Sequence, residues 1–68
     1  MTPAEIAQTR RMLRIATRDY VHYSMKARSY EQRQLDIPPG VRMAIVDCQS
    51  TIDRLQAELC AAGVEVEN

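Results

Sequence analysis

The sequence predicts an all-α fold: a two-helix antiparallel hairpin that dimerises into a four-helix bundle. Two apolar stripes with 3-4-3-4 spacing and a proline-rich break between them support this prediction. The first stripe consists of Ile6, Thr9, Leu13, Ala16, Tyr20, Tyr23, Ala27 and Tyr30. The second stripe consists of Val41, Ile45, Cys48, Ile52, Leu55, Leu59 and Ala62. Both have the period of a coiled-coil seam, so each helix is expected to bury one side against the other.

The first helix is expected over about residues 3–35. Thr2 and Glu5 have the spacing of a capping box, and Pro3 suits the first helical position because its missing N–H costs nothing there. No glycine or proline follows until Ile37-Pro38, and a residue that precedes proline is disfavoured in the helical region. A turn is therefore expected at residues 36–38.

The second helix is expected over about residues 39–62, with Pro39 in its first turn. Gly63 is placed to take a left-handed conformation and end this helix. Residues 63–68 are expected to form a frayed tail. The whole chain, residues 1–68, is then a single helical-hairpin domain.

Size favours a homodimer, since chains of 68 residues bury little surface and often rely on oligomerisation. The second helix is expected beside only the last two-thirds of the first, which leaves the turns around Met1, Ile6 and Thr9 without an intrachain partner. Apolar residues also lie off both seams, and two helices alone bury one stripe each. The residues expected at the dimer interface are Ile6, Met12, Val21, Met43 and Val46.

Composition excludes several other classes of protein. Nine basic and nine acidic residues cancel, which argues against a general polyanion binder. No apolar run reaches the length of about 18 residues typical of a membrane span, and no leader pattern is present, so a cytoplasmic location is expected. Cys48 and Cys60 lie too far apart on one helix to form a disulfide. No catalytic residue, metal site or cofactor is expected, and the chain is not expected to be an enzyme.

A basic segment of the first helix is the expected partner-binding surface. Its residues are Arg10, Arg11, Arg14, Ile15, Arg18, His22 and Met25. Guanidinium groups bind carboxylates and phosphates alike, so the partner is either an acidic protein or a nucleic acid. Two simpler interpretations stay open at this point. In the first, the arginines form a solvated face or pair with the acidic second helix of a neighbouring subunit. In the second, the off-seam apolar residues serve only the dimer interface.

The chain resembles the Rop family of plasmid RNA-regulating proteins. The shared features are the Thr2 and Glu5 start, the long first helix, Asp36 in the turn, a seam cysteine early in the second helix, and a polar tail after Gly63. The resemblance implies a dimeric four-helix bundle that binds paired RNA loops through the outer faces of its first helices. The matching outward positions hold Arg10, Arg14 and Arg18 with no aromatic among them, so phosphate contacts rather than base stacking are implied.

Small inhibitors and anti-activators made by phages and other mobile elements are similar in size and in lacking a pocket. The sequence therefore leads to two functional hypotheses. The first is a small, non-enzymatic, homodimeric interaction protein that binds and modulates or inhibits a protein partner such as a regulator. The alternative is a Rop-like regulator that binds RNA or another nucleic acid through the arginine-rich face of the first helix.

Overall fold

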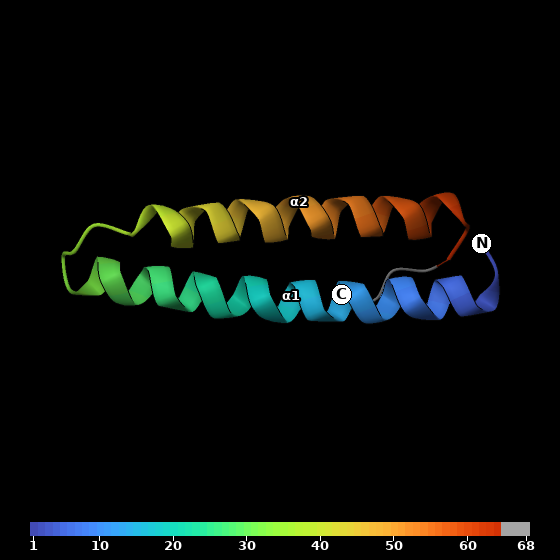
Figure 1. Ribbon diagram of the computed structural model, residues 1–68, viewed down its shortest axis with the longest axis horizontal. Coiled ribbons are helices and arrows are strands. Elements are labelled where there is room, and N and C mark those ends of the chain that lie inside the picture. The colour runs from blue at the N-terminus through green and yellow to red at the C-terminus, as the bar shows by residue number, and fades with distance from the viewer. Residues whose placement is uncertain (65–68) are drawn as a thin grey trace.

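A computed structural model describes residues 1–64, which form two helices, α1 (Pro3–Gln32) and α2 (Pro39–Ala61). Figure 1 shows the two helices lying antiparallel side by side, so that the start of α1 is next to the end of α2. The molecule is a rod of 47 × 15 × 15 Å. The predicted all-α hairpin is confirmed.

The capping box predicted at the start of α1 is present. The backbone amide of Glu5 donates to the Thr2 Oγ1 atom at 3.2 Å, and the Thr2 amide donates to Glu5 Oε1 at 3.3 Å. Two amides that the helix itself leaves without acceptors are thereby satisfied. Pro3 occupies the first helical position, as the sequence indicated.

The end of α1 differs from the sequence prediction. The helix ends at Gln32, three residues before the predicted position, because Gln34 adopts a left-handed conformation with φ of 57°. The Gln34 amide donates to the carbonyl of Glu31 and the Leu35 amide to the carbonyl of Tyr30, both at 2.9 Å. This is a Schellman motif, which usually has a glycine at its left-handed position. The sequence has a glutamine there and so gave no stop signal.

The chain then returns along α1 before α2 begins. Ile37 and Pro38 are half-buried in this connection, and Pro39 is the first residue of α2. The end of α2 at Ala61 lies within one residue of the prediction, and Gly63 has the expected left-handed φ of 73°. Val64 packs against the core, so the expected fraying is wrong for this residue. Residues 65–68 of the predicted tail lie outside the described part of the chain.

The core follows the two predicted stripes. The residues buried in the described chain all belong to them: Thr9, Leu13, Ala16, Ala27, Val41, Ile52, Leu55 and Leu59. The hydroxyl of Thr9, which is only 7% exposed, donates to the Glu5 carbonyl at 2.9 Å and so remains hydrogen-bonded. Ala62 is the exception among the stripe residues, because it is exposed at the end of α2.

The first turns of α1 do have an intrachain partner, contrary to the expectation from helix lengths. Ile6 packs against the cluster that contains Leu55 and Leu59, and Thr9 is buried. The returning connection after Gln32 occupies the far end of α1, so α2 lies beside the earlier turns instead (Figure 1). Of the three residues expected to lack a partner, only Met1 is largely uncovered, at 53% exposed. The lengths of the two helices therefore do not indicate a dimer.

Candidate interaction surfaces

The outer side of α1 carries a row of arginines. Residues spaced three and four apart lie along one side of a helix, and these positions point away from the buried stripe of Leu13 and Ala16. We call this surface the arginine face. It consists of Arg11, Arg14, Ile15, Arg18, His22, Met25 and Arg28, all exposed.

The structure thus places six of the seven expected partner-binding residues on one face. The seventh, Arg10, is exposed but lies about 100° round the helix from Arg11, nearer to the seam. Arg28 continues the face by one turn beyond Met25, and the partner-binding set chosen from the sequence did not include it. Its spacing of three residues from Met25 and fourteen from Arg14 was the available signal.

The arginine face is positively charged and has few acidic partners among the described residues. Within residues 1–64, the one ion pair joins Arg18 Nε to Asp19 Oδ1 at 3.8 Å, and both side chains are largely exposed to solvent. Such a pair contributes little to stability. The guanidinium groups of Arg11, Arg14 and Arg28 make no ion pair in this part of the chain. Although the net charge of the chain is zero, positive charge is therefore concentrated on one side of α1.

Apolar side chains lie between these arginines. Ile15 is 45% exposed and Met25 is 67% exposed. His22 is also exposed, and its ring lies edge-on to the ring of Tyr23 at a centroid distance of 5.4 Å. The described residues contain no group of three or more His, Cys, Asp or Glu placed to hold a metal ion. The surface therefore offers charge and apolar anchors, which are features of a binding surface.

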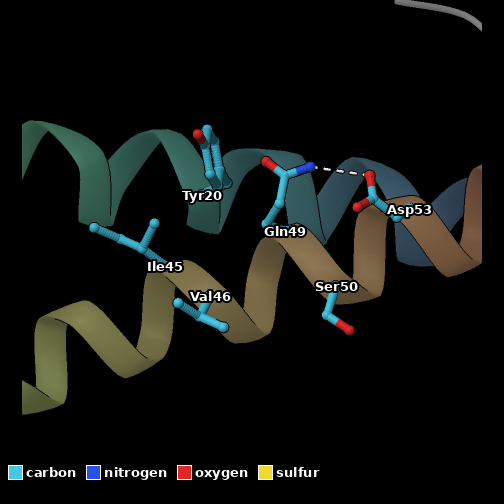
Figure 2. Close-up of a pocket in the computed structure, with 6 residues that line it drawn as sticks. All are labelled: Tyr20, Ile45, Val46, Gln49, Ser50 and Asp53. Atoms are coloured by element: carbon cyan, nitrogen blue, oxygen red, sulfur yellow. Dashed lines mark hydrogen bonds between the residues drawn. The ribbon is translucent and has the colours of Figure 1, made fainter.

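A shallow hollow lies between the two helices on a different side of the rod. Figure 2 shows that Tyr20 of α1 lies on one side of it and that α2 supplies the other residues. The hollow is lined by Tyr20, Ile45, Val46, Gln49, Ser50 and Asp53. The Gln49 Nε2 atom donates to Asp53 Oδ1 at 3.0 Å along the α2 side (Figure 2).

This hollow was not predicted from the sequence. Each seam was taken as a single line, whereas Tyr20 and Ile45 both lie toward the same edge of the seam. Seven-residue numbering of the two stripes puts these residues at equivalent positions, so the signal was present in the spacing.

The expected dimer-interface residues do not form one surface. Ile6 is half-buried against the core. Met12 and Val21 are nine residues apart and therefore lie about 180° apart around α1. Met43 points away from the seam on the outer side of α2. Helical geometry leaves only Val21 and Val46 on the same side of the rod, the side that contains the hollow.

The two cysteines have different environments. Both are free thiols, Cys48 half-buried in the seam and Cys60 exposed. Burial raises the pKa of the Cys48 thiol, and the nearby carboxylates of Asp19 and Asp47 raise it further. Cys48 is therefore a poor nucleophile at neutral pH, as its seam position indicated.

Comparisons of the chain with protein-family models, curated proteins and solved structures gave no match. Neither described helix is both long and apolar enough to span a membrane.

Proposed function

We propose that this chain is a small, non-enzymatic, homodimeric interaction protein that binds an acidic protein partner, such as a regulator, and modulates or inhibits it. The observation that carries the proposal is the arginine face, where the guanidinium groups of Arg11, Arg14 and Arg28 make no ion pair within residues 1–64 and exposed Ile15 and Met25 lie among them. The same surface was expected from the sequence to bind a partner.

Arginine and methionine are enriched at protein interfaces, where arginine forms bidentate bonds to carboxylates and methionine adapts its shape to the partner. A few buried anchors usually supply most of the binding free energy, inside a polar rim that excludes water. Ile15 and Met25 would be such anchors, with Arg11, Arg14 and Arg18 around them.

Rigidity supports the same proposal. The face lies in the middle of a 30-residue helix that is packed along its length, so its backbone loses little conformational freedom on binding. By contrast, the hollow between the helices is open to solvent. Its carboxylate, Asp53, accepts a hydrogen bond from Gln49 and is not paired with a side chain that could act as a nucleophile. A binding role is therefore better supported than a catalytic one.

A nucleic-acid partner is the second candidate, favoured by the regular spacing of the arginines. Arg11 and Arg18 lie about 10 Å apart along the axis of α1, with Arg14 between them. Such a row can follow the phosphates of a folded RNA. The tyrosines, which would stack on bases, are half-buried in the seam instead. This difference places the nucleic-acid candidate second.

Site-specific photo-crosslinking tests the proposal. A photoreactive amino acid is placed at Ile15 on the arginine face or, as a control, at Ala57, which is exposed on α2. Each variant is irradiated in a lysate of the cells that make the chain, with and without nuclease. We expect a protein adduct from position 15 that survives nuclease and is absent from position 57. Adducts that disappear with nuclease would select the nucleic-acid candidate, and equal adducts from both positions would contradict both candidates.

Charge removal gives a second readout. The triple variant R11Q/R14Q/R18Q should lose the position-15 adduct and keep its helical circular dichroism. The matched control R42Q/R54Q removes two exposed arginines from α2 and should keep the adduct. The salt dependence of binding distinguishes the two candidates. For binding to duplex DNA, log K falls by roughly 0.9 per phosphate contact for each unit increase in the logarithm of the salt concentration. A mixed apolar protein interface is expected to weaken less steeply.

A further inference from the structure

The proposed homodimer leaves open which surface a second copy covers. We propose that a second copy of this chain covers the side of the rod that contains the hollow, and that the arginine face stays free for the partner. We call this side the groove face. Its centre consists of Tyr20, Val21, Ile45 and Val46. The inference rests on the homodimer of the proposed function and assigns its contact surface.

Exposed apolar area is the first argument. Val21 is 50% exposed and Val46 is 62% exposed, and they flank the half-buried Tyr20 and Ile45. The groove face therefore receives apolar side chains from both helices. On the opposite side of the seam the exposed apolar residues, Met12 and Ile15, come from α1 alone. A second hairpin needs a surface built by both helices, which only the groove face provides.

The surface area of the chain is the second argument. A compact chain of this mass is expected to expose roughly 4,400 Å², whereas this one exposes 5224 Å². One side of the 47 × 15 Å rod covers about 700 Å², close to the roughly 800 Å² that each partner contributes to a standard stable interface. The rod therefore offers a side that is large enough for a stable interface with a second copy.

Charge is the third argument, and it separates the two faces. A two-fold symmetric contact sets a surface against itself, so the arginine face would oppose arginines with arginines. The groove face carries both signs at its rim, with Asp53 on α2 and Arg10 on α1, which lies eleven residues before Val21 and therefore on the same side of the helix. Arg10 of one copy can therefore meet Asp53 of the other. Self-association is consistent with the groove face and is disfavoured at the arginine face.

Sedimentation velocity on the full chain tests this inference through two matched substitutions. V46R places a charge at the centre of the groove face, while M12R places the same charge at a methionine on the opposite side. We expect the unmodified chain and M12R to sediment as dimers at tens of micromolar. V46R is expected to raise the dimer dissociation constant at least tenfold while keeping helical circular dichroism.

A further variant keeps the test decisive if V46R fails to fold. Ser50 is exposed and lines the hollow, so S50R should weaken the dimer without touching the core. The inference is overturned if the unmodified chain is monomeric at these concentrations, if the folded groove variants remain dimeric, or if M12R dissociates as readily as they do. The variant R11Q/R14Q/R18Q separates the two proposals. A dimer that persists while the partner adduct is lost supports both assignments, whereas a dimer lost with these arginines overturns the present one.

Discussion

The backbone amide of Val64 donates to the carbonyl oxygen of Leu59 at 2.9 Å, across the left-handed residue Gly63. Leu35 and Tyr30 have the same relationship at the end of α1, across Gln34. The two helices therefore end in the same motif, once with glycine and once with a residue that carries a Cβ atom. In both motifs the left-handed position determines where the helix stops.

This pair predicts two substitutions of opposite effect. G63A places a Cβ atom in the left-handed region and should lower the free energy of unfolding by roughly 1 kcal/mol, whereas Q34G should raise it by a similar amount. Urea denaturation followed by circular dichroism measures both. The control is G40A, which has open space for the Cβ atom and should stabilise α2 by about 0.5–1 kcal/mol. A destabilising Q34G would contradict the strain at Gln34.

Core truncation should be severe at Leu59. This side chain is 1% exposed and contacts the main cluster, so L59A is expected to cost about 2–5 kcal/mol. L35A is the matched control, because Leu35 is 52% exposed and its truncation should change the free energy of unfolding by less than about 0.5 kcal/mol. Both variants are compared by urea denaturation at one protein concentration. Equal effects would mean that Leu59 is not part of the core in solution.

A substitution to a charged residue tests the same seam. Leu55 is 2% exposed, and L55D would bury an unpaired carboxylate in the core cluster. Loss of helical circular dichroism at 25 °C is the expected result. A V46D variant, which places the same charge on an exposed residue, should keep its helical signal. Retained helicity in L55D would be incompatible with the packing described above.

The start of α1 should make stability depend on pH. Hydrogen bonds from Thr2 lower the pKa of the Glu5 carboxyl below its ordinary value of 4.5. A lowered folded-state pKa contributes stability that is present above the unfolded value and is lost as the pH falls through the folded value. The melting temperature of the unmodified chain should therefore exceed that of E5Q at pH 7, and the difference should shrink below pH 4.5. A difference that does not change with pH would exclude this ionisation as its source.

Thiol labelling should separate the two cysteines. Iodoacetamide at pH 8 is expected to modify Cys60 first, because Cys48 is half-buried and its pKa is raised by burial and by Asp19 and Asp47. Mass spectrometry of single-cysteine variants, C48S and C60S, measures each rate. In urea the two rates should become similar. Faster modification of Cys48 in the native chain would contradict its position in the seam.

Much of the fold could be predicted from the sequence because its signals are local. The capping box needs only Thr2 and Glu5, and the start of α2 follows from two consecutive prolines. The stripes also predicted burial well, since Leu13, Leu55 and Leu59 occupy the spacing that the seam requires. Periodicity reports which side of a helix faces its partner, and a hairpin with a single seam depends on little else.

The parts that could not be predicted depend on conformation or on the space between the helices. Gln34 ends α1 by adopting a left-handed backbone conformation, which is not predictable from a glutamine in the sequence. The helix therefore ends earlier than predicted. That shift also changed the relative length of the helices and led to the wrong expectation for Ile6 and Thr9. By contrast, the placement of Met12 and Val21 on opposite sides of α1 follows from their spacing of nine residues and could have been predicted from the sequence.

The confinement of the buried side chains to two stripes has a consequence for how this molecule can change. Substitutions on the arginine face change the charge and shape of that surface without touching the residues that hold the helices together. A few outward side chains can therefore be exchanged while the hairpin stays the same. The residues that stabilise the fold and the residues that form the outer surface occupy separate positions of the same helices.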